Sequence, residues 1–189
     1  MRKTNCVVRV VMLMTLTFLL APALSAFANA PQVNARLVKQ IRHELATLPY
    51  YGVFDWLEFE MKPDNTVVLR GYVTRPTTKS EAEARVKDIE GVKSVINEIQ
   101  ALPVSPNDDR LRIALYRQLY NWDSPLFRYA TQAIPSIHII VQGGRAILKG
   151  VVNSKADAQL AYMRARSVPG LFDVKNELIV EGESPGVGE

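Results

Sequence analysis

The sequence contains one pattern twice. Residues 67–73 (VVLRGYV) reappear as residues 146–152 (AILKGVV), and residues 91–99 (GVKSVINEI) reappear as residues 170–178 (GLFDVKNEL). Both pairs are displaced by 79 residues, so the spacing between the two parts is the same in each copy. A repeat at a fixed displacement indicates that one supersecondary unit is used twice. We therefore expect two similar small domains rather than one continuous core.

Hydrophobic periodicity predicts the same elements in each copy. Apolar residues at three- and four-residue spacing predict a first helix over residues 34–45 and residues 109–119. Alternation over residues 57–61 and 137–141 predicts a first strand with one buried face, which puts His138 on the other face. The remaining elements are a second strand (67–73; 146–152), a second helix starting near Pro76 and Ser154, and a third strand (95–99; 174–178).

The fold class that follows is α+β. Each copy reads helix–strand–strand–helix–strand, with a three-stranded mixed sheet covered by two helices. The first two strands form an antiparallel hairpin, and the helical crossover makes the second and third strands parallel. The predicted organisation is a signal peptide (1–28), domain 1 (33–102), a linker (103–108), domain 2 (109–181) and a disordered tail (182–189).

The repeated glycines and asparagines are interpreted as parts of the scaffold. Gly71 and Gly150 stand inside predicted strands, where glycine marks a close backbone approach, here expected to be that of the following helix. Gly91 and Gly170 are expected to end the second helices in a left-handed conformation. The other positions assigned to this structural motif are Gly144 in the second hairpin turn, Asn97 and Asn176.

The first 28 residues have the features of a secretory signal peptide. Arg2, Lys3 and Arg9 precede an uncharged apolar run over residues 10–21, and small residues follow at positions 26, 28 and 30. The run is shorter than the roughly 20 residues that a membrane span requires. We expect cleavage after Ala28 and a periplasmic mature protein. A lipid anchor is not expected, because the single cysteine, Cys6, precedes the apolar run.

Cleavage would change what the charge and the cysteine content imply. The whole chain has a net charge of +4, but without the three basic residues of the signal it has 20 basic and 19 acidic residues. A mature charge near +1 gives no support for a nucleic-acid partner. The mature chain would also lack cysteine, which excludes disulfides and thiol chemistry.

The repeated motif resembles the BON domain of bacterial envelope proteins. The family pattern is a turn glycine, V-x-L-x-G-x-V, a helix, and G-V-x-x-V-x-N-x-L. The second copy matches it at Gly144, Leu148, Gly150, Val152, Gly170, Val174, Asn176 and Leu178; the first matches at Val67, Leu69, Gly71, Val73, Gly91, Val92, Val95, Asn97 and Ile99, and departs at Asn65, where the turn glycine is expected.

The resemblance implies a non-enzymatic periplasmic protein. A signal peptide followed by two such domains is similar to the osmotically inducible periplasmic members of the family. The members are associated with phospholipid membranes or with the assistance of envelope proteins under stress. In a lipoprotein relative, the lipid contact lies on the first helix of the second domain and around it, which implies the same region here.

Aromatic residues gather where the two copies stop matching. Eight of them lie in the two loops between the first helix and the first strand, and the second loop is six residues longer. Tryptophan and tyrosine beside arginine suit a membrane interface, with rings at headgroup depth and guanidinium on phosphate. The predicted lipid or partner contacts are Arg117, Trp122, Phe127, Arg128 and Tyr129. The alternative is that these rings cover the sheets or pack the two domains together.

No pattern of catalytic or metal-binding residues is predicted, and no cofactor. His43 and His138, the two histidines, lie at non-equivalent positions without carboxylates at ligand spacing. Two functions remain open. One is contact with a phospholipid membrane surface, anionic lipids included, in envelope and osmotic-stress maintenance. The other is a chaperone-like or scaffolding role toward unfolded envelope polypeptides.

Overall fold

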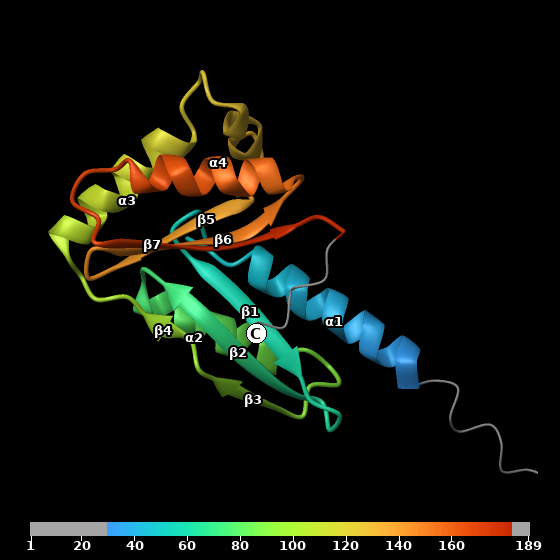
Figure 1. Ribbon diagram of the computed structural model, residues 1–189. Coiled ribbons are helices and arrows are strands. Elements are labelled where there is room, and N and C mark those ends of the chain that lie inside the picture. The colour runs from blue at the N-terminus through green and yellow to red at the C-terminus, as the bar shows by residue number, and fades with distance from the viewer. Residues whose placement is uncertain (1–29, 183–189) are drawn as a thin grey trace, which may run out of the picture. The chain divides into compact units, whose positions relative to one another are not determined.

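The computed structural model describes residues 30–182, with side chains from residue 35 onward. The predicted signal peptide (1–28) and residues 183–189 of the predicted tail lie outside the described residues. From Leu37 onward the described chain forms one compact unit that contains both copies of the repeat. Figure 1 shows the elements of this unit in chain order.

The first copy folds into an α+β domain with the predicted order of elements. The sheet has the order β1–β2–β3, with β1 antiparallel and β3 parallel to β2. The third strand is divided, because the pairing with β2 stops at Asn97 and resumes at Gln100 as β4. The elements are α1 (Ala30–Ala46), β1 (Trp56–Met61), β2 (Thr66–Val73), α2 (Pro76–Lys87), β3 (Ser94–Asn97) and β4 (Gln100–Ala101).

The second copy repeats this topology with a continuous third strand. Its sheet has the order β5–β6–β7, and β7 stays parallel to β6 over eight residues. A short 3-10 helix, η1, is added in the loop after the first helix. The elements are α3 (Pro106–Leu119), η1 (Pro125–Ala130), β5 (Ile137–Gln142), β6 (Arg145–Val152), α4 (Lys155–Arg166) and β7 (Asp173–Val180).

In each domain the two helices cover one face of the sheet. In the first, Leu37 and Ile41 of α1 pack with Ala82 and Val86 of α2 and with alternate residues of β2. The second core has the same composition, with leucines from α3, alanines from α4 and alternate residues of β5 and β6. Figure 1 shows α3 and α4 side by side over the second sheet. The apolar stripes seen in the sequence are therefore the two cores.

Helix α3 begins earlier than residue 109, where periodicity places its start. Ser105 is the N-cap, its hydroxyl accepts from the Asp108 amide, and Pro106 occupies the first turn. Asp108 is buried, and its carboxylate accepts from the amides of Gly143 and Gly144, each at 2.9 Å. This aspartate therefore ties the helix start to the second hairpin turn, a role beyond that of a surface charge at a helix end.

The glycines inside β2 and β6 allow the close approach of a different segment from the one expected. Gly71 and Gly150 have φ of +126° and +123°. A Cβ on either would lie 1.9 Å from a backbone carbonyl oxygen at the start of the neighbouring strand, that of Trp56 or Ser136, and not against a helix. Gly91 and Gly170 do have positive φ, but α2 and α4 end at Lys87 and Arg166 with right-handed caps. These two glycines therefore lie in the turn beyond the cap.

Candidate functional site

The long loop of the second domain divides into buried and exposed aromatic residues. Tyr120 is buried, and its hydroxyl donates to the Ile137 carbonyl at 2.6 Å. Leu126 and Tyr129 of η1 are buried in the second core. The Ser124 hydroxyl caps η1 by accepting from the Leu126 amide. Half of this loop therefore serves the fold of its own domain.

Two of the five predicted contact residues are held by hydrogen bonds and ion pairs within the second domain. The Tyr129 hydroxyl donates to Asp157 at 3.0 Å and accepts from the Asn153 amide at 2.8 Å. Arg128 is half exposed, and its guanidinium pairs with the same carboxylate. Burial alone would raise the pKa of Asp157, but bonds from Ser154, Tyr129 and Arg128 hold it below its usual value. Tyr129 and Arg128 thus fasten η1 to the start of α4.

The side chains of the other three predicted contacts have no hydrogen-bond or ion-pair partner within residues 30–182. Trp122 is 79% exposed, and its ring lies 5.2 Å from that of Phe127, which is half-buried. Arg117 is exposed in the last turn of α3. Nothing in the second core requires the Trp122 ring. The contact role of these three residues stays a prediction.

The structure adds two residues that the interpretation missed. Ile113 and Tyr116 on α3 are 47% and 37% exposed and share a side of the helix with Arg117, because residues three and four apart are neighbours. The sequence did contain a signal for them. The core stripe of α3 takes every fourth residue from Leu111, so Ile113 and Tyr116 are apolar side chains that lie outside the stripe. We refer to Ile113, Tyr116, Arg117, Trp122 and Phe127 as the α3 surface.

The loop of the first domain packs against the second domain. The Val53 carbonyl accepts from the Ile139 amide of β5 at 2.8 Å, and Val53 and Phe54 pack on the second core. The Phe54 ring meets Tyr116 edge-on at 6.3 Å. Of the two interpretations of this loop, packing between the copies is the one the structure supports.

His138 is buried by this loop, which corrects the prediction that it lies on an open face. The side chain is 6% exposed, and its Nδ1 lies 2.6 Å from the Asp55 carbonyl oxygen. Tyr51 and Trp56 place their rings 5.7 and 5.1 Å from the imidazole. Burial is the main reason that the pKa of His138 is lowered. Alternation predicted one buried face, but β5 is buried on both because another segment covers it.

The loop keeps its shape through a buried carboxylate. Asp55 accepts from the Gly52 amide at 3.0 Å and from both the amide and the hydroxyl of Thr74, at 2.6 and 2.9 Å. Tyr50 takes a positive φ of 64° at the start of the loop and is 68% exposed. The Asp55 bonds therefore fix the backbone that presents Val53 and Phe54 to β5.

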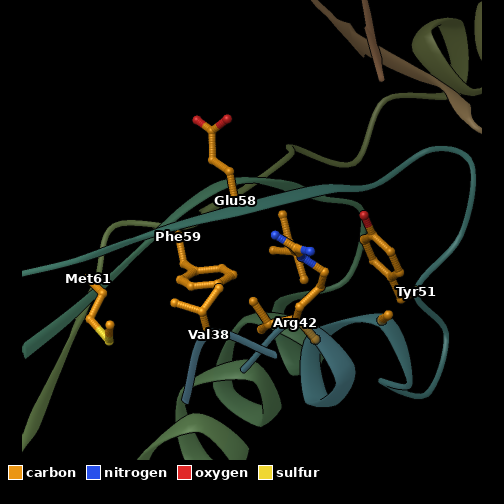
Figure 2. A pocket seen from close by; sticks show the side chains of 9 residues that line it. Val38, Arg42, Tyr51, Glu58, Phe59 and Met61 are labelled. Carbon is orange, nitrogen blue, oxygen red and sulfur yellow. The ribbon is translucent and has the colours of Figure 1, made fainter. Parts of the chain in front are cut away.

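A groove of about 600 Å³ runs between α1 and β1 of the first domain. Its walls are mostly apolar. Figure 2 shows Phe59 pointing from the strand toward Val38 of the helix, with Arg42 rising from the helix between Phe59 and Tyr51. Met61 lies at one end, and Glu58 also contributes to the lining. We refer to this feature as the first-domain groove.

The described residues offer no metal site. Within residues 30–182, no three His, Cys, Asp or Glu side chains gather as metal ligands would. His43 is exposed on α1. None of the helices in this range is both long and apolar enough to cross a bilayer.

Two solved structures of CdsD, a structural protein of the type III secretion system of Chlamydia trachomatis, are similar to this chain. The first, of its C-terminal domain, has 14% identity, covers 76% of this chain and 96% of that one, and gives a TM-score of 0.30. The second has 16% identity, covers 77% and 92%, and gives 0.29. No curated protein matches the chain.

The comparison with family models is decisive for the classification. The model of the BON domain matches residues 35–103 and residues 124–182, one segment in each copy of the repeat. Helix α3 and Trp122 lie outside the second segment, so they are not part of the matched pattern. The two segments together cover more than half of the sequence. The chain therefore belongs to the BON domain family.

Proposed function

We propose that this protein is a non-enzymatic periplasmic envelope protein that contacts phospholipid membranes through the α3 surface. BON domains are non-catalytic in general and are linked to the binding of membrane phospholipid. The periplasmic location rests on the signal-peptide features of residues 1–28. The role would be maintenance of the envelope under osmotic stress.

The exposure of Trp122 is the observation that carries the proposal. The indole is 79% exposed, lies 5.2 Å from the Phe127 ring at a tilt of 55°, and has no role in the core. At a membrane interface its ring would sit at headgroup depth, with Ile113 reaching the acyl boundary. Arg117 would meet lipid phosphate. With a mature charge near +1, long-range attraction is small, so we expect weak binding that depends on this local surface.

Flotation tests this function. Mature protein is mixed with vesicles of phosphatidylglycerol and phosphatidylethanolamine, and the bound fraction is compared for Trp122→Ala and Phe172→Ala. Phe172 is the matched control, because it is 80% exposed in the same domain and lies outside the α3 surface. Trp122→Ala should lose most of the binding and Phe172→Ala should keep it. Equal binding by both variants, or no binding by the wild type, would contradict the proposal.

A second candidate function is chaperone-like or scaffolding binding of exported polypeptides. The open first-domain groove favours it, because such a groove beside an edge strand can accept an extended chain. Light scattering from an unfolded outer-membrane protein, without lipid, measures this activity. If stoichiometric amounts of the mature protein leave aggregation unchanged, the candidate is rejected.

A further inference from the structure

The repeat creates two equivalent grooves, one between the first helix and the first strand of each domain. Helix positions correspond at a displacement of 74 residues, so Arg42 matches Tyr116. Strand positions correspond at 80, so Phe59 matches Ile139. The strand register confirms that Phe59 matches Ile139, because Phe59 lies opposite Leu69 in the first sheet as Ile139 lies opposite Leu148 in the second. What occupies one groove therefore indicates what the other is shaped to receive.

The groove of the second domain is already filled by a segment of the same chain. Val53 lies in a turn at the outer edge of β5, and its carbonyl accepts from the Ile139 amide. Phe54 turns toward α3, where its ring meets Tyr116. Both side chains pack on the second core. The occupant is thus a turn over residues 52–55, closed by a bond from the Asp55 amide to the Gly52 carbonyl, with an aliphatic and an aromatic residue at its centre. The Asp55 carboxylate itself turns back to Gly52 and Thr74.

The first-domain groove offers the same features without an occupant from the described chain. Because Phe59 has the register of Ile139, its N–H also points out of the sheet edge. Among residues 30–182, no loop carbonyl accepts from this amide. Arg42 is exposed, and within the same range it has no ion-pair partner. Glu58, the other charged lining residue, accepts from the Trp56 indole at 3.1 Å.

We propose that the first-domain groove binds a turn of a second polypeptide, with an aliphatic–aromatic pair at its centre followed by an acidic residue. A backbone carbonyl of the segment accepts from the Phe59 amide, as Val53 does for Ile139. The aliphatic and aromatic side chains rest on Val38, Phe59 and Met61. The acidic side chain pairs with Arg42, the exposed cation of the groove lining.

A peptide fits these features better than an acyl chain does. Backbone carbonyls satisfy an unpaired edge amide, whereas a hydrocarbon tail leaves it without an acceptor. This site is separate from the α3 surface, so either proposal can fail alone. Specific recognition of such a segment is also distinct from general suppression of aggregation.

The probe is a blocked peptide with the sequence of residues 50–56, titrated into ¹⁵N-labelled mature protein and followed by NMR. We expect the amide signals of Phe59 and Met61 to shift with saturation. A peptide with serine in place of the valine and phenylalanine should not bind. Arg42→Gln should weaken the affinity about two- to fivefold, as for an exposed ion pair. Val38→Trp should abolish binding by filling the groove.

Lys39→Gln is the matched control, since Lys39 is exposed on the same helix outside the groove lining. It should bind like the wild type. The proposal is overturned if the Phe59 signal does not shift, or if only signals around Ile139 shift, which would show competition with the chain's own loop. It also fails if oleate shifts Phe59 and the peptide does not. Concentration-dependent dimerisation through Phe59 without peptide would identify a second copy as the occupant instead.

Arg42→Gln keeps the test valid should Val38→Trp fail to fold, because the Arg42 side chain is exposed and contributes no core contact. Retention of the wild-type far-UV circular dichroism establishes folding for each variant. Unchanged affinity in folded Arg42→Gln, together with unchanged affinity for a peptide carrying asparagine at its acidic position, would reject the assigned role of Arg42.

Discussion

At the scale of single residues, the repeated asparagines make the same hydrogen bonds to backbone groups in both domains. The Asn97 side-chain amide donates to the Lys79 carbonyl, and its oxygen accepts from the Ile99 amide. Asn176 makes the equivalent bonds to Ala158 and Leu178. In both copies the asparagine thus fastens the third strand to the second helix. Sequence spacing identified the two asparagines as part of the motif, but only their hydrogen-bond partners show why asparagine stands at these positions.

Substitution of Gly71 or Gly150 by alanine should be strongly destabilising. The new Cβ would meet a backbone carbonyl oxygen at 1.9 Å, at a positive φ that non-glycine residues rarely adopt. We expect each change to lower the free energy of unfolding by roughly 2–4 kcal/mol. Urea unfolding measures this. Gly52→Ala is the control, because a Cβ there meets nothing within 4 Å; equal losses at Gly52 and Gly71 would contradict the explanation.

The buried carboxylate of Asp108 should make stability depend on pH in the acid range. Burial would raise its pKa, but the amides of Gly144 and Gly143, with Ser105 and Arg112, hold the pKa below the ordinary value. A group with a lowered folded pKa stabilises the fold above its unfolded pKa of about 4 and loses that contribution as pH falls through the folded pKa. Urea midpoints between pH 2 and pH 6 should therefore fall in acid, and less steeply in Asp108→Asn.

Equivalent elements acquire different surroundings. Strand β1 forms one wall of an open groove, whereas β5 is covered along its outer edge by the loop before β1. The two helices differ in the same way, since α1 presents Arg42 where α3 presents Tyr116 to Phe54. Within the described residues, the repeat therefore produces one open and one filled groove from the same topology.

Phe54→Ala should destabilise the second domain although residue 54 lies in the first. The ring packs on the second core and on Tyr116, and a half-buried phenylalanine should contribute about 1–3 kcal/mol. Thermal or urea unfolding followed by the NMR signals of β5 measures the loss. Tyr50→Ala, in the same loop but 68% exposed, should cost less than about 1 kcal/mol. A Phe54→Ala variant as stable as Tyr50→Ala would refute the packing role.

For the whole molecule, the predicted removal of the signal peptide would lower the net charge from +4 to about +1. Most of the +4 charge of the full chain comes from the basic start of the predicted signal peptide. We expect the exported protein to begin at Asn29, close to the first residue of α1, Ala30. Mass spectrometry of the periplasmic fraction gives the N-terminus. An intact Met1 in that fraction would contradict the predicted cleavage.

The sequence by itself determined the local and repeated features of this protein. The repeat, the apolar stripes and the turn residues predict two domains with a hairpin and a crossover, and the strand pairing confirms them. These features depend on residues close in the chain, so periodicity and spacing report them. The BON family followed from the same positions.

Tertiary structure decided which side chains are available for contact. Tyr129 is held inside by Asp157, His138 is buried by a loop more than 80 residues earlier, and Trp122 stays exposed. Each outcome depends on whether a distant segment covers the side chain, and hydrophobic patterning within one element cannot report such a partner. The same physical reason leaves the first-domain groove open and the second one filled.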